Sequence, residues 1–243
     1  MTPPTTASDV RLAASECSSL VQLDALVTEC RACPRLVEWR ERVATEKRRS
    51  FANDSYWGRP VPGFGDPGAS ILVVGLAPAA HGGNRTGRMF TGDRSGDWLF
   101  AALYRAGFAN QPTSMSTDDG LVLSGVRITA AVRCAPPANQ PTPTERDTCS
   151  PWLDADLRLT PARVVVVLGS FAWTAALAAI GRTGVALPRP RPKFGHAVET
   201  IVGDWTVIGS FHPSQQNTFT GKLTEPMLDA VFRRARIVAG LDA

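Results

Sequence analysis

The chain has 243 residues, 44% of them hydrophobic, which predicts a folded protein and argues against disorder. The net charge of +4 and the pI of about 9.0 permit a polyanionic partner without requiring one. No apolar run approaches the roughly 18 residues of a membrane helix, and the N-terminus lacks the pattern of a secretory signal. We therefore expect a cytoplasmic protein with no membrane partner.

The N-terminal quarter predicts helices that break near a pair of cysteines. Residues 1–18 are expected to form a flexible tail, and one domain is expected over 19–243. Apolar residues recur at helical spacing over 20–42, and Pro34 interrupts the pattern. The polar stretch 45–67 is rich in glycine and proline, and this composition predicts a loop that packs on the core.

Four apolar runs of strand length then alternate with helical segments. Strands are expected at 71–75, 126–132, 163–168 and 205–209. Helices are expected at 95–107, 144–159, 171–180 and 224–239, with N-caps at Ser95 and Thr144 and a break or kink at Pro151. Because nearly continuous apolar strands alternate with helices, we predict an α/β fold with a parallel sheet covered on both faces.

Ligands of open parallel sheets bind at the carboxyl ends of strands, so the segments after the first, second and fourth strands are candidates for a binding site. The first, at 75–93, reads G-L-A-P-A-A-H-G-G-N-R-T-G-R-M-F-T-G-D. Its five glycines allow a ligand to approach the backbone, and Phe90 is suited to stacking on a flat base. The alternative is a structural loop in which Phe90 fills the core. The G-x-G-x-x-G spacing of a dinucleotide-binding loop is missing.

The other two segments carry polar side chains held by prolines. In R-C-A-P-P-A-N-Q-P-T-P, at 133–143, the amide of Asn139 matches the edge of a base, or else it satisfies its own turn. In F-H-P-S-Q-Q-N, at 211–217, His212 can present a ring nitrogen to a substrate, although a single histidine is more often structural. The polar residues after it can contact phosphates or base edges.

Five cysteines, an odd number in a chain expected in the cytoplasm, argue against a disulfide framework. Cys30 and Cys33 form a C-x-x-C pair, and Cys134 and Cys149 lie far downstream. This spacing suits a zinc site or a 4Fe-4S iron–sulfur cluster, and buried cysteines without a ligand are the third possibility. Cys17 stands alone and is not assigned.

Basic residues gather at 47–49 and again at 189–193, where Arg189, Arg191 and Lys193 alternate with prolines. Solvated loops are the alternative interpretation of both groups.

The three motifs and four cysteines, in this order, resemble the family 5 (type B) uracil-DNA glycosylases over about residues 30–217. The resemblance implies a three-layer α/β/α sandwich on a central four-stranded parallel sheet. It implies a structural 4Fe-4S cluster on Cys30, Cys33, Cys134 and Cys149. It also implies base excision repair, in which the N-glycosidic bond of uracil, and of other deaminated bases such as hypoxanthine, is hydrolysed to leave an abasic site. The partners would be double- and single-stranded DNA containing deaminated bases.

The resemblance also suggests roles for single residues. Phe90 would stack on the base, Asn139 would contact the base edge or the catalytic water, and His212 would contact the leaving-group oxygen. Backbone amides of the 75–79 turn would bind the departing base, which adds three residues to the expected substrate site: Gly75, Ala77 and Ala79. We further expect DNA contacts from Arg189, Arg191, Lys193, Ser214, Gln215, Gln216 and Asn217.

One departure concerns the first motif. Other uracil-DNA glycosylase families place a carboxylate or amide close after its leading glycine, where this chain has Leu76 and Ala77. The type B family shares that absence, so the resemblance holds. Asp93 is the nearest acid in the same segment, and we expect it to be catalytic together with Asn139 and His212.

Two other classes of function are weighed against a monomeric glycosylase. A non-catalytic, zinc-containing nucleic-acid-binding module would be colourless and would produce no abasic sites. An unrelated α/β hydrolase is disfavoured, because the chain lacks the G-x-S-x-G nucleophile elbow.

Overall fold

The computed structural model describes residues 3–241, whose strands form a six-stranded sheet in the order β1-β3-β2-β4-β6-β5. Its four central strands are parallel. They are β2 (Ile71–Gly75), β3 (Val126–Ala130), β4 (Val164–Leu168) and β6 (Trp205–Ser210). The edge strands β1 (Phe64–Gly65) and β5 (Glu199–Val202) are antiparallel to their neighbours. The α/β fold is confirmed, but the prediction of a purely parallel, four-stranded sheet is wrong. Neither edge strand is a buried apolar run, because one has two residues and the other is partly exposed.

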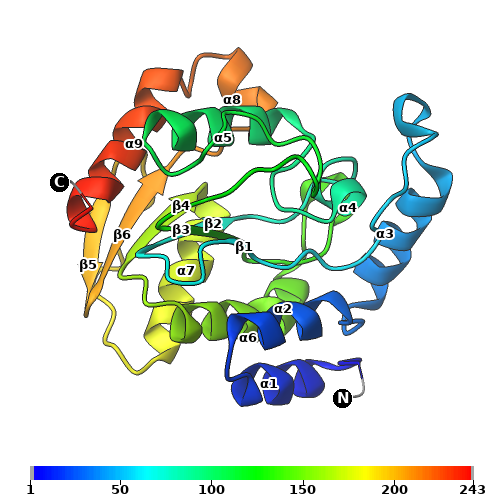
Figure 1. Ribbon diagram of the computed structural model, residues 1–243. Helices are drawn as coiled ribbons and strands as arrows, with labels where there is room; N and C mark the ends of the chain where they lie inside the picture. The colour runs from blue at the N-terminus through cyan, green and yellow to red at the C-terminus, as the bar shows by residue number, and fades with distance from the viewer. Residues whose placement is uncertain (1–2, 242–243) are drawn as a thin grey trace.

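Helices cover both faces of the sheet, which confirms the three-layer sandwich. Helices α5 (Arg94–Arg105) and α9 (Glu225–Val238) lie on one face, and α6 (Pro143–Leu159) and α7 (Ser170–Arg182) lie on the other (Figure 1). Side chains of β2 alternate between two cores: Ile71 and Val73 pack on the first face, Leu72 and Val74 on the second. Burial on both faces explains why the central strands read as continuous apolar runs.

The N-terminal helices α1 (Ala7–Glu16) and α2 (Leu20–Thr28) pack outside α6, and α3 (Pro34–Glu46) runs along the side of the molecule toward α4 (Gly83–Thr86) (Figure 1). The expected flexible tail over 1–18 is wrong where the structure describes it, while residues 1–2 lie outside the described part. Thr6 caps α1 in a capping box, and Val10 and Ala14 are buried in the core shared with α6. Contact with α6 therefore stabilises a helix whose own apolar stripe is short.

Helix starts differ by two residues from the predicted ones. Asp93, not Ser95, caps α5, and Thr142, not Thr144, caps α6. Each cap accepts a hydrogen bond from the backbone N–H three residues on. Helix α6 continues through Pro151, although the sequence predicts a break or kink there. Packing of the turns around this proline outweighs the one hydrogen bond that is lost.

Short helices occupy the connections: η1 (Arg49–Phe51), α4 (Gly83–Thr86), η2 (Pro137–Asn139) and α8 (Gln215–Phe219). Across residues 3–241, none of the helices has the length and apolarity to cross a bilayer.

Candidate active site

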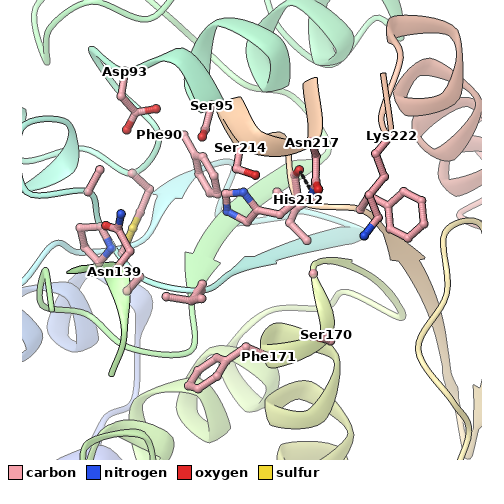
Figure 2. A pocket seen from close by; sticks show the side chains of 18 of the residues that line it. Phe90, Asp93, Ser95, Asn139, Ser170, Phe171, His212, Ser214, Asn217 and Lys222 are labelled. Atoms are coloured by element: carbon pink, nitrogen blue, oxygen red, sulfur yellow. Dashed lines mark hydrogen bonds between the residues drawn. The ribbon is translucent and has the colours of Figure 1, made fainter. Parts of the chain in front are cut away.

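A cavity of about 570 Å³ opens at the carboxyl ends of the parallel strands (Figure 2). Its walls are the segments that follow β2, β3, β4 and β6. Nineteen residues line it: Leu76, Ala77, Pro78, Ala79, Met89, Phe90, Asp93, Ser95, Asn139, Leu168, Gly169, Ser170, Phe171, Phe194, Phe211, His212, Ser214, Asn217 and Lys222. The fold thus brings together Asp93, Asn139 and His212, which are far apart in the sequence.

The start of α7, directly after β4, lines the cavity with Ser170 and Phe171, although sequence reasoning did not select it. The rule that ligands bind at strand carboxyl ends applies to β4 as well, so this segment could have been found. Lys222 also reaches the cavity, and its ammonium lies 5.0 Å from the centre of the Phe211 ring. Nothing in the sequence around Lys222 distinguishes a lysine that lines a cavity from one that only faces solvent.

Phe90 belongs to the core and to the cavity wall at once. Its side chain is 9% exposed, and its ring centroid lies 6.0 Å from that of His212 (Figure 2). Its φ of 55° is unusual for a residue other than glycine. The ring also lies over Gly75, where an added Cβ would come within 2.7 Å of it. Gly75 is therefore needed so that Phe90 can pack there, which gives this glycine a steric role.

Phe90 is held in place by a buried ion pair on the neighbouring Arg88. The Arg88 guanidinium lies 2.6 Å from Asp119, and its Nε donates to Thr91. Hydrogen bonds from Arg88 and from the backbone N–H of Met115 help to lower the pKa of Asp119 to about 2 against the opposing effect of burial. This anchored segment offsets the strain of the Phe90 backbone.

The His212 side chain projects into the cavity from a loop that is braced at two points (Figure 2). The Asn217 amide donates to the His212 carbonyl (2.9 Å). The backbone N–H of Phe211 donates to Nδ1 of His196 (3.2 Å), whose ring lies 5.1 Å from the Phe211 ring. Sequence reasoning did not assign His196 a role, and no local pattern links it to Phe211. Burial lowers the pKa of His212 to about 4, so the imidazole is neutral at pH 7.

Because burial lowers its pKa, His212 makes stability depend on pH. Between about pH 6.5 and 4 the unfolded chain binds a proton on this ring that the folded chain does not bind. The free energy of unfolding therefore falls on acidification. We expect the parent to lose about 2 kcal/mol more than His212→Gln between pH 7 and pH 5. Urea unfolding of both proteins at the two pH values measures this difference, and equal losses would contradict it.

Asp93 caps α5 and also faces the cavity. Its Oδ1 accepts from the backbone N–H of Gly96 (2.9 Å). Gly82 lies so close to the carboxylate that an added Cβ would overlap Oδ2. Burial raises the pKa of Asp93, although hydrogen bonds from the backbone of Gly96 and Ser95 oppose the shift. The fold thus keeps an acid in an environment that disfavours its charge, as is common at reactive sites.

Asn139 lies at the exposed margin of the cavity, in the turn η2, with a φ of 57°. The turn is closed by the backbone, because the N–H of Asn139 donates to the carbonyl of Pro136 (3.2 Å). Among the described residues the side-chain amide has no hydrogen-bond partner, so it does not satisfy its own turn. It is available to a ligand as both donor and acceptor.

The expected DNA-contacting residues lie around the same opening. Trp173 donates to the carbonyl of Pro192 (3.0 Å), and Phe194 lines the cavity, so the proline-rich basic loop is anchored beside it. Arg189, Arg191 and Lys193 are exposed, and none of them forms an ion pair within residues 3–241. Ser214 and Asn217 line the cavity, while Gln215 and Gln216 are exposed on α8.

The four cysteines expected to bind metal line one small, mostly apolar cavity beside α3 and α6. Cys30 and Cys33 precede α3, Cys134 lies in the turn after β3, and Cys149 belongs to α6. All are free thiols. Cys17 is buried, as Cys134 and Cys149 are, but it donates to a backbone carbonyl of α1 and does not line this cavity. Cys17, which the sequence left unassigned, therefore lies outside the cavity that the other four cysteines share.

Two N–H groups donate to sulfur in this cluster of cysteines. Nη1 of Arg40 lies 2.9 Å from Sγ of Cys134, and the backbone N of Arg133 lies 3.3 Å from Sγ of Cys149. Such hydrogen bonds stabilise negative charge on a metal-bound sulfur. Within the described residues, no three His, Cys, Asp or Glu side chains are arranged to hold a single metal ion.

The comparison with known families decides where this fold and site belong. A match to the uracil DNA glycosylase superfamily covers residues 62–236, which include all three motifs and all six strands of the sheet. The chain belongs to this superfamily.

Several curated relatives are named Type-5 uracil-DNA glycosylase. The protein of Mycobacterium tuberculosis is 58% identical over 227 residues, which cover 92% of this chain and 83% of that protein. The protein of Thermus thermophilus is 50% identical over 217 residues, covering 88% and 96%. A Type-4 uracil-DNA glycosylase of Sulfurisphaera tokodaii is 31% identical over 156 residues, covering 63% and 64%. The resemblance to family 5 is therefore confirmed.

Proposed function

We propose that this protein hydrolyses the N-glycosidic bond between uracil and deoxyribose in DNA, leaving an abasic site for base excision repair. The observation that carries the proposal is the cavity in which Phe90, Asp93, Asn139 and His212 meet, in a chain 50–58% identical to proteins named as uracil-DNA glycosylases. Other deaminated bases, such as hypoxanthine, are proposed as further substrates. The protein would act as a cytoplasmic monomer on double- and single-stranded DNA.

The cavity suits a base that has left the duplex stack. Extrusion of a nucleotide costs a few kcal/mol, and least in a mispair, which favours uracil opposite guanine. Phe90 offers its ring to the flat base. Ala77 and Ala79 line the cavity, and their backbone N–H groups, in the described part of the chain, donate to no other group. They are therefore free to bind a carbonyl oxygen of the base.

Breaking the bond develops negative charge on the base and positive charge on the sugar. The neutral imidazole of His212 donates a hydrogen bond to the departing base, and this bond strengthens as charge develops. Asp93 supplies the negative charge that favours a cationic sugar, and with Asn139 it orients the water that attacks the sugar. Because water then captures an already electrophilic carbon, stabilisation of the leaving base dominates the rate.

Incubation with a duplex containing one uracil, followed by alkali, tests the proposal directly. Alkali cuts the strand at an abasic site, so a labelled strand shortens at the uracil position if the base has been excised. A parallel duplex with hypoxanthine tests the wider substrate range, and a thymine duplex is the control. Intact uracil strands with folded, iron-replete protein would instead favour a nucleic-acid-binding module without catalysis.

We also propose that Cys30, Cys33, Cys134 and Cys149 hold a structural 4Fe-4S cluster. Four thiols around one cavity, with N–H donors directed at two of them, suit anionic sulfur. The cluster, when bound, ties α3, α6 and the turn after β3 together.

We expect Arg189, Arg191 and Lys193 to contact phosphates of bound DNA. Replacing all three with glutamine should weaken binding to every sequence alike, because phosphate contacts carry no base information. The slope of log K against log salt concentration should become shallower by about 0.9 for each phosphate that is no longer neutralised. Fluorescence anisotropy over a salt series measures it, with Arg11→Gln on the remote helix α1 as control. An unchanged slope would exclude these contacts.

A further inference from the structure

Several basic side chains in the described part of the chain have no carboxylate partner. Many arginines in residues 3–241 form ion pairs, including the exposed Arg31, Arg182 and Arg234. Arg48 and Arg49 are exposed, and no ion pair holds them within the described chain. They share this property with the basic residues of the proline-rich loop. Both groups of residues prove to lie beside the active-site cavity.

The segment that carries Arg48 and Arg49 is fastened to the first glycine-rich motif. Arg85 of that motif forms an ion pair with Asp54 (2.7 Å), and its guanidinium lies 4.1 Å from the centre of the Phe51 ring. The backbone N–H of Trp57 donates to the Arg85 carbonyl (2.9 Å). These contacts keep the basic pair in a defined place, which a free surface loop would not do.

The same segment reaches the cavity wall through His81. Tyr56 Oη and His81 Nδ1 are hydrogen-bonded (2.9 Å), and Ala79, two residues before His81, lines the cavity. Burial first, and then the charges of Arg48 and Arg85, lower the pKa of His81, as expected if Arg48 is close to this ring. Figure 1 shows the end of α3 and the chain after it on the same side of the molecule as α4.

The two basic groups lie on opposite sides of the cavity. The first motif follows β2, whereas the proline-rich loop connects α7 to β5 beyond β4 and β6 in the strand order. A cation on one side alone would hold DNA on one flank of the extruded nucleotide. Cations on both sides of the cavity can bind the DNA backbone both before and after the extruded nucleotide. Guanidinium groups suit this partner because they bind phosphate with two parallel hydrogen bonds.

We propose that Arg48 and Arg49 bind backbone phosphates of duplex DNA on the β2 side of the cavity, opposite the proline-rich loop. The inference rests on the proposed function, because that function makes DNA the partner. Lys47 is excluded from this role, since it is half-buried and its ammonium donates to the carbonyl of Ala52 (3.3 Å). Its positive φ of 53° shapes the turn that presents the two arginines.

The test compares Arg48→Gln/Arg49→Gln with a control of equal charge change, Arg11→Gln/Arg233→Gln. Arg11 and Arg233 are exposed on α1 and α9, and neither forms an ion pair within residues 3–241. The probe is a duplex that carries a tetrahydrofuran abasic analogue, with affinity measured by fluorescence anisotropy over a salt series. We expect the salt slope to become shallower by about 1.8 in the first variant, that is 0.9 for each of two phosphates, and to stay at the parent value in the control.

Further variants and an excision assay make the outcome decisive. Arg48→Lys/Arg49→Lys keeps the charge and should restore the slope, which separates phosphate binding from a folding defect. Equal slopes for parent and glutamine variant, or an equal change in the control, would overturn the inference. If the parent itself leaves uracil intact, the proposed function fails; if it excises uracil but the slope is unchanged, only this inference fails.

Discussion

Replacing His212 with alanine is expected to slow single-turnover excision of uracil by about 100- to 1,000-fold, with little change in duplex affinity. Removal of one donor that binds developing charge has an effect of this size. The ring is neutral and projects into the cavity, and neither of its nitrogens has a hydrogen-bond partner among residues 3–241. Its hydrogen bond is therefore available to the departing base. Rates are measured at saturating, iron-replete protein, where binding no longer limits excision.

The matched comparison is Asp93→Asn, because asparagine caps a helix as well as aspartate does. The pKa of Asp93 is raised, so its contribution to stability is present below about pH 3.8 and is lost as the pH rises through the folded pKa. At neutral pH the asparagine variant should thus be at least as stable as the parent. We expect it to excise uracil more slowly than the parent but faster than His212→Ala. If capping were the only role of Asp93, its rate would equal that of the parent.

Two further outcomes are informative for the assignment. A lower melting temperature with parent-like excision by folded His212→Ala would mean that His212 only holds its loop. Parent-like rates in both variants would show that neither residue is catalytic. The chemistry would then rest on Asn139 and the backbone amides of Ala77 and Ala79.

The sequence predicts the centre of the fold better than its edges, for a physical reason. Strands β2, β3 and β4 are buried throughout and β6 over its last four residues, so they read as mostly apolar runs. Strand β5 is largely exposed and pairs on one side only, which removes that signal. Helix α1 forms because Val10 and Ala14 contact a helix more than 130 residues away in the sequence, and no local pattern contains that information.

In the candidate site, too, the features set by the local sequence could be predicted, and those set by contacts between distant segments could not. Phe90, Asn139 and His212 follow strands, so their convergence can be predicted from topology alone. The brace that His196 gives to the His212 loop depends on the pairing of β5 with β6, which the sequence did not reveal. The two interpretations of Phe90, core filling and base stacking, could not be separated from the sequence because both hold: one ring packs on Gly75 and lines the cavity.

Replacing Cys134 with alanine is expected to remove bound iron and most of the soluble protein. Cys134 is 8% exposed, and its sulfur accepts from Arg40, which is itself 2% exposed. Loss of the thiol removes one proposed ligand and leaves that buried guanidinium without this acceptor, and each effect destabilises the fold. The parent should be brown, with broad absorbance near roughly 400 nm, as expected of a thiolate-bound iron–sulfur centre.

Cys17→Ala is the matched control for Cys134→Ala, because Cys17 is just as deeply buried but lies outside the four-cysteine cavity. It should keep the colour and the iron content of the parent, with at most a modest loss of stability from one small cavity. The readouts are iron and zinc per chain, the absorbance spectrum and the yield of soluble protein, all after anaerobic purification. One zinc and no iron in the parent would exclude the cluster and point to a zinc site. Loss of iron in Cys17→Ala as well would mean that iron retention follows general stability, and the assignment of the four ligands would lose its support.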